Sequence, residues 1–207
     1  MQLKQGISLC LLIGSTFFLS SCLDIETRIQ FASEESGRLQ LEYTLSSILI
    51  QMRTTSAPDL LVPLPISRED FQKSVLAVPG LNLRSYDRKD FPEKSTILAS
   101  LDFSTVSDLN AFFGGDKPVF TKGIERGERY LEVLIAPGSP NGLDPKTKEF
   151  LNAFFPTYSL RFHLTFPTPV KRTSLNKAQI EGNTTRLEIP LLEALDSLDP
   201  YKWRIFW

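Results

Sequence analysis

A period-two alternation of apolar and polar side chains is the feature that most limits how this chain can fold. Between Leu23 and Phe31, apolar or β-branched residues occupy every second position, and the same alternation returns over Arg38–Leu45, Thr96–Phe103 and Tyr158–Phe166. Successive side chains of a strand point to opposite faces, so these segments predict strands with one face in a core and one face in water. The chain is therefore expected to fold around antiparallel sheet.

Short polar segments separate these strands and predict hairpins. Ser33–Gly37 lies between the first two strands, and Gly182-Asn183 lies between the strands expected at Lys177–Glu181 and Thr184–Ile189. The charged segment Asp87–Glu93 reads as a further turn. Other strands are expected at Leu81–Tyr86, Val119–Lys122, Arg129–Ile135 and Tyr201–Trp207.

Three helices are predicted from their capping residues and apolar stripes. Ser67 with Asp70, Ser104 or Thr105, and Asp144 followed by Pro145 are typical helix starts. A short helix is also expected within Pro190–Leu195. The fold class is α+β, with a mostly antiparallel sheet of about eight strands built from hairpins and about three amphipathic helices packed on it.

The first 21 residues have the layout of a secretory signal peptide. Lys4 precedes an apolar run from Ile7 to Leu19, and the small residues Ser20 and Ser21 follow. The run is shorter than the roughly 20 apolar residues that a spanning helix needs. We therefore expect a signal peptide over residues 1–21 and a single α+β extracytoplasmic domain over residues 22–207.

Leu19-Ser20-Ser21-Cys22 resembles the bacterial lipobox. The resemblance implies cleavage between Ser21 and Cys22, lipidation of the Cys22 thiol with chains such as palmitate, and acylation of its new amino group. Two or more acyl chains hold a protein on a membrane, whereas one gives only reversible binding. The membrane is thus the expected partner, with the domain on the periplasmic face or the cell surface. Leu23 stands where an inner-membrane retention signal would place Asp, which slightly favours the outer membrane.

Composition and motif searches argue against several classes of function. The whole chain carries 23 Lys and Arg against 24 Asp and Glu, which is not the charge of a nucleic-acid binder. His163 is the only histidine, and Cys10 would leave with the signal peptide, so neither a metal site nor a cofactor is predicted. His163 is interpreted as a surface residue, and no catalytic residues can be named, so the chain is not expected to be an enzyme.

Three functional hypotheses remain open. The first is binding of a lipid or other apolar ligand between sheet and helices, in a cavity lined by Phe112, Phe113, Phe154, Phe162 and Phe166. The second is a structural or interaction lipoprotein with a solid core, which docks an envelope partner through the apolar, proline-rich loop 57–66. The third is an unrecognised hydrolase with carboxylates that converge only in space.

The two ends of the mature chain resemble the LppM-type family of bacterial lipoproteins. The similar stretches are Leu23–Leu45, Thr165–Val170, Glu181–Thr185 and Trp203. In that family a strand begins just after the lipobox cysteine, and a proline turn, a Gly/Asn hairpin and a late tryptophan follow. The resemblance implies an α+β envelope domain with lipid or glycolipid as a suggested ligand, and it carries over no catalytic residue.

Overall fold

The structure is a computed structural model that describes residues 25–47, 50, 65–114, 118–154 and 157–207. Eleven strands and four helices are assigned within these ranges. The first part of the chain contains β1 (Ile25–Phe31), β2 (Gly37–Ser46), α2 (Arg68–Leu76), β3 (Leu81–Asp90), β4 (Lys94–Phe103) and α3 (Val106–Phe113). The second part contains β5 (Phe120–Glu125), β6 (Glu128–Ala136), α4 (Pro145–Phe154), β7 (Ser159–Thr165), β8 (Arg172–Thr173), β9 (Gln179–Glu181), β10 (Thr184–Pro190), α5 (Leu191–Leu195) and β11 (Tyr201–Phe206).

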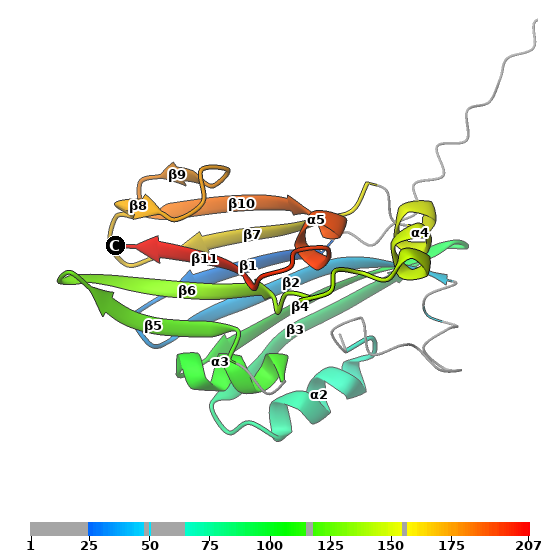
Figure 1. Cartoon of the computed structure of the whole chain (residues 1–207). Coiled ribbons are helices and arrows are strands. Elements are labelled where there is room, and N and C mark those ends of the chain that lie inside the picture. The colour runs from blue at the N-terminus through cyan, green and yellow to red at the C-terminus, as the bar shows by residue number, and fades with distance from the viewer. Residues whose placement is uncertain (1–24, 48–49, 51–64, 115–117, 155–156) are drawn as a thin grey trace, which may run out of the picture.

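The strands form two sheets that lie face to face (Figure 1). One has seven strands in the order β3-β4-β2-β1-β7-β10-β9, and the other has four in the order β5-β6-β11-β8. The α+β class and the predicted hairpins are confirmed, while the division into two sheets is a feature of the tertiary structure. All pairings are antiparallel except that of β1 with β7, which is parallel.

The hydrophobic core lies between the two sheets. Leu41 and Ile97 point inward from the seven-stranded sheet, and Trp203 and Leu131 point inward from the four-stranded sheet, each at most 1% exposed. The rings of Phe162 and Trp203 approach to 6.5 Å between centroids and so join the two layers. The inward faces therefore match the apolar half of the sequence alternation, as expected for sheets with one wet face.

Local signals set the helix starts as predicted. Ser67 caps α2 in a capping box with Asp70, and Thr105 rather than Ser104 caps α3 in a capping box with Asp108. Each box satisfies two backbone N–H groups that a helix end would otherwise leave without a partner. The α2 and α3 helices lie side by side below the sheets in Figure 1, and α4 lies at the end of the seven-stranded sheet where β1 begins.

The turns of two hairpins, β9–β10 and β3–β4, can be compared with the turns predicted from the sequence. The β9–β10 hairpin turns through Gly182-Asn183, and Gly182 has the positive φ of 61° that a type II′ turn requires at its first central position. The expected turn Asp87–Glu93 is shorter in the structure, because β3 continues to Asp90 and pairs with Ser95 on β4. The polar side chains of this extension suit an edge strand with solvent on its outer side.

Candidate functional site

The outer face of the seven-stranded sheet carries a shallow polar hollow of about 350 Å³, which we call the basic hollow. Four adjacent strands contribute to it. The side chains around it are Arg28 and Gln30 from β1, Arg38 and Gln40 from β2, His163 and Thr165 from β7, and Thr184 and Arg186 from β10, with Ile29 completing the lining. Among the described residues, no Asp or Glu lines this hollow.

Strand register brings the arginines and His163 together. Arg28 on β1 lies directly opposite His163 on β7, and His163 lies opposite Arg186 on β10. Adjacent strands are about 4.8 Å apart, so the three groups form a row across the sheet. Arg38 lies opposite Gln30 in the next row. The basic hollow therefore exists only because segments far apart in sequence pair in one register.

Each arginine of the basic hollow also contacts a carboxylate at its edge. Arg28 Nε donates to Glu26 Oε1 at 2.7 Å, and Arg38 Nε donates to Asp102 Oδ1 at 3.1 Å. Arg186 Nη2 lies 3.3 Å from Glu181 Oε2. A guanidinium has five N–H donors, so these pairs orient the side chains and still leave donors for a ligand. The arginine side chains remain 40–49% exposed.

His163 is the titratable group of the basic hollow. Burial lowers its pKa from the ordinary value, and the charges of Arg186, Arg28 and Arg161 lower it further, while Glu26 opposes them. The Nε2 atom of His163 lies 3.5 Å from Glu26 Oε1. The imidazole is therefore mostly neutral at pH 7, and the arginines supply the positive charge there.

An acidic row lies beside the basic hollow, one step closer to the start of β1. Glu26 lies opposite Glu42 on β2 and opposite Arg161 on β7, and Arg161 lies opposite Glu188 on β10. Three carboxylates and one guanidinium thus cross the same sheet face. The outer face is consequently divided into an acidic end near Ile25 and a basic region farther along β1.

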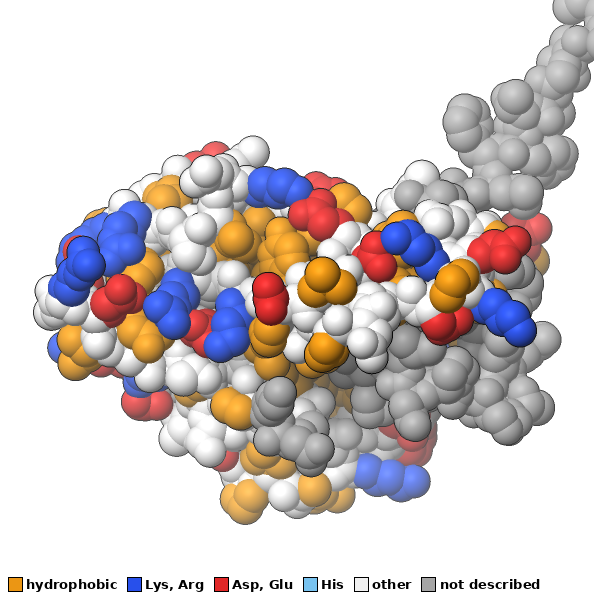
Figure 2. Space-filling model, in the orientation of Figure 1, with side chains coloured by type: hydrophobic (Ala, Val, Ile, Leu, Met, Phe, Trp, Pro, Cys, Tyr) orange, Lys and Arg blue, Asp and Glu red, His pale blue; other side chains and the backbone are white. Residues whose placement is uncertain are grey.

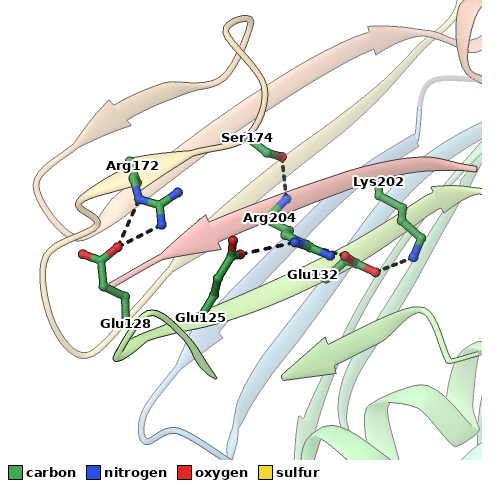
Figure 3. A network of polar contacts seen from close by, with 7 residues as sticks. All are labelled: Glu125, Glu128, Glu132, Arg172, Ser174, Lys202 and Arg204. Atoms are coloured by element: carbon green, nitrogen blue, oxygen red, sulfur yellow. Dashed lines mark hydrogen bonds and ion pairs between the residues drawn. The ribbon is translucent and has the colours of Figure 1, made fainter. Parts of the chain in front are cut away.

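The outer face of the four-stranded sheet carries a network of ion pairs (Figure 3). Glu132 on β6 lies at its centre, where Lys202 Nζ donates to Oε1 at 2.7 Å and Arg204 Nε donates to Oε2 at 2.6 Å. Burial alone would raise the pKa of Glu132, but these hydrogen bonds and charges outweigh it and hold the pKa below its ordinary value. Charged side chains of both signs are interleaved on this side of the molecule (Figure 2).

Aromatic rings support this network from below. The Arg172 guanidinium stacks 3.4 Å from the ring centroid of Phe206, and the Arg204 guanidinium lies 5.1 Å from that of Tyr130. A second hollow of about 320 Å³ adjoins the network and is lined by Glu132 and Lys202 together with Pro118, Val119, Thr121, Leu134, Pro137 and Pro200. Because both cations already neutralise Glu132, this region is interpreted as a structural clamp on β6 and β11.

The predicted apolar lining residues lie in several aromatic clusters. Phe112 and Phe113 belong to α3 and contact each other, and Phe112 also stacks on Phe71. Phe166 follows β7 and stacks between Phe31 and Trp207, with centroids 5.3 and 4.6 Å away. Neither of the two hollows described above is lined by any of these rings.

Phe162, on β7, packs against Trp203, and the side chain of Phe154, at the end of α4, lies outside the described part of the structure. Ser21, Cys22 and positions 57–64 of the predicted docking loop also lie outside the described residues. The end of that loop is held on the sheet: Tyr86 Oη donates to the Ile66 carbonyl at 2.7 Å, and Tyr43 Oη donates to the Pro65 carbonyl.

Searches for two other kinds of site in the described ranges gave negative results. No group of three or more His, Cys, Asp and Glu side chains is arranged there to hold a metal ion. No helix in those ranges has the length and apolar character that crossing a membrane requires.

Sequence reasoning treated His163 as a surface residue and did not single out Arg28, Arg38 or Arg186. Each of these arginines occupies a polar position of an alternating strand, where a charged side chain is ordinary. The sequence does indicate that three strands each carry an arginine on the solvent-facing side of the sheet. Without the strand order, however, nothing in the sequence brings them together.

Similarity to known proteins is found among solved structures. No protein-family model matches the chain, and no curated protein matches it in sequence. Among solved structures it is similar to the folded domain of LppM from Mycobacterium tuberculosis, determined by NMR, with a TM-score of 0.45 and 12% sequence identity over 89% of this chain and 88% of that one.

Proposed function

We propose that this chain is a membrane-anchored lipoprotein of the cell envelope, without enzymatic activity, whose domain is held at the bilayer by an acylated Cys22. The signal-peptide and lipobox pattern from Lys4 to Cys22 supports export and attachment to the membrane. The observation that carries the proposal furthest is the position of β1, which begins at Ile25, three residues after Cys22, and is hydrogen-bonded on both sides by β2 and β7.

This position has a geometric consequence for the anchored domain. An extended chain spans at most about 3.6 Å per residue, so three residues reach about 10 Å. A lipid on Cys22 would therefore hold the Ile25 end of the seven-stranded sheet within about 10 Å of the bilayer surface. The domain would face the aqueous compartment with little freedom to move away from the membrane.

The packing of the aromatic clusters bears on what the anchored domain binds. Phe112 and Phe113 of α3 contact each other, Phe162 on β7 contacts Trp203 on β11, and Phe166 stacks on Trp207, which is the close packing expected of a filled core. A filled core favours recognition on the outside of the sheets. A second candidate role is docking of an envelope partner through loop 57–66, which is supported by the hydrogen bonds that tie its Pro65 and Ile66 carbonyls to tyrosines of the sheet.

The anchor is tested by metabolic labelling of the full-length protein with an alkyne fatty acid, followed by mass spectrometry of the mature N-terminus. Cys22→Ala should abolish labelling and leave an unprocessed precursor. Cys10→Ala is the matched control, because Cys10 lies in the segment that cleavage removes, and this variant should label and mature like the wild type. Normal labelling of Cys22→Ala would refute the proposal.

A further inference from the structure

We propose that the basic hollow binds a phosphate-type anion, carried either by a soluble molecule or by a lipid headgroup. The observation behind this is the row of Arg28, His163 and Arg186 on three neighbouring strands, with Arg38 beside it. Binding of the anion does not require the anchor at Cys22, and only the direction from which the ligand arrives rests on the proposed anchoring. Failure of either proposal would leave the other standing.

The chemistry of the lining fits an oxyanion. Three guanidinium groups contribute positive charge; each is paired with a carboxylate at the edge of the hollow, and none of these carboxylates lines the hollow itself. Guanidinium groups present paired N–H donors that match two oxygens of a phosphate. Gln30, Gln40, Thr165 and Thr184 add amide and hydroxyl groups around the cations. A phosphate therefore finds both charge complementarity and hydrogen-bond donors on one sheet face.

The size of the basic hollow limits the ligand. Its volume of about 350 Å³ is at the lower end of the range for small-molecule sites, roughly 300–1,000 Å³. The hollow is shallow and open, so it suits a small charged group whose remainder extends into solvent. A phosphate monoester or a phosphodiester headgroup meets this description.

The acidic row points to the source of the ligand. Glu26, Glu42 and Glu188 lie between the basic hollow and the Ile25 end of the sheet, which would be the bilayer side of an anchored domain. Like charges repel, so anionic headgroups of the anchoring bilayer would meet the acidic row before they reach the arginines. This arrangement favours a ligand that arrives from the aqueous side.

His163 makes the expected affinity depend on pH. The charged groups that face it are Glu26 and Arg28 from β1, Arg161 from its own strand, and Arg186 from β10. A bound anion favours the charged imidazole, so binding and protonation of His163 are coupled. For a phosphodiester, whose charge stays constant in this range, affinity should therefore rise as the pH falls from 7.5 to 5.5, because the imidazole gains its proton more readily in the complex. A phosphate monoester gains a proton of its own at about pH 6, so it does not isolate the effect of His163.

The test is calorimetric titration of the full-length protein in detergent with inorganic phosphate and with glycerol phosphate, at low and at moderate salt. We expect saturable binding that Arg28→Gln together with Arg186→Gln weakens at least tenfold. Arg129→Gln is the charge control: it removes one positive charge, against two in the double variant, at a 58% exposed position on the other sheet, and affinity should change less than twofold. Far-UV circular dichroism and melting temperature establish that each variant is folded.

A second variant and a vesicle measurement complete the test. His163→Gln should retain phosphate binding at pH 7.5 and lose the increase in affinity that the wild type shows at pH 5.5 for a phosphodiester such as dimethyl phosphate. The full-length protein in phosphatidylcholine vesicles, with and without phosphatidylglycerol, is titrated with glycerol phosphate to distinguish the sources, because the acyl anchor would hold it on either vesicle. Weakening of this titration by phosphatidylglycerol, lost in Arg28→Gln, assigns a headgroup, and an unchanged titration assigns a soluble ligand. Absence of saturable binding to both phosphates, or an equal loss in Arg129→Gln, would overturn the proposal.

Discussion

Trp203 offers a sharp test of how the two sheets are held together. Its side chain is fully buried on β11 and faces Phe162 across the core. Among the described residues, its indole Nε1 has no hydrogen-bond partner. Replacement by Phe removes this N–H together with part of the ring, whereas replacement by Ala removes the whole contact. The two variants should therefore differ clearly in their free energy of unfolding.

The magnitudes follow from the buried volume and the buried donor. Trp203→Phe opens a cavity of about 40 Å³, which costs about 1 kcal/mol at roughly 24 cal/mol per Å³. The transfer term of the lost ring carbons adds about 1.5 kcal/mol. Removing a buried donor without a partner returns about 1–3 kcal/mol. The net cost should lie between about −0.5 and 1.5 kcal/mol, against about 3–5 kcal/mol for Trp203→Ala.

The assay is urea unfolding followed by far-UV circular dichroism, because tryptophan fluorescence would lose its main buried reporter. Trp207→Phe is the control, since Trp207 is only partly buried and stacks on Phe166 at the edge of the core. That substitution should cost about 1 kcal/mol or less. A loss of more than about 3 kcal/mol in Trp203→Phe would refute the reasoning, because it would mean that the indole N–H contributes a hydrogen bond.

Two further predictions concern polar contacts between elements. Asn110→Ala should lower the free energy of unfolding by about 1–3 kcal/mol, measured as a shift of the urea midpoint. The Asn110 side chain joins α3 to β5, because it accepts a hydrogen bond from the Phe120 N–H at 2.7 Å and donates one to the Phe120 carbonyl at 2.8 Å. An unchanged midpoint would contradict this. The pKa of Glu132 is lowered in the folded state, so its stabilising effect is present above the unfolded pKa and is lost as the pH falls through the folded one. The wild type should therefore lose more stability between pH 5 and pH 3 than Glu132→Gln, and parallel profiles would exclude this role.

The local features of the fold and the proposed membrane anchor could be predicted from short stretches of sequence. Ser67 and Thr105 cap their helices through residues three positions away, and Gly182 permits a turn between strands that are neighbours in the chain. Such interactions involve only a few consecutive residues, so they can be read without the fold. The expected lipid anchor likewise rests on a short continuous segment that ends at Cys22.

Which strands lie beside one another could not be predicted from the sequence and is known from the three-dimensional fold. The parallel pairing of β1 with β7, and the separation of β5, β6, β8 and β11 into a second sheet, depend on contacts between distant segments and on burial of two apolar faces against each other. The basic hollow follows from the same register. Arg28 and Arg186 each look like ordinary solvent-facing residues in sequence, and they become neighbours of His163 because β7 lies between β1 and β10.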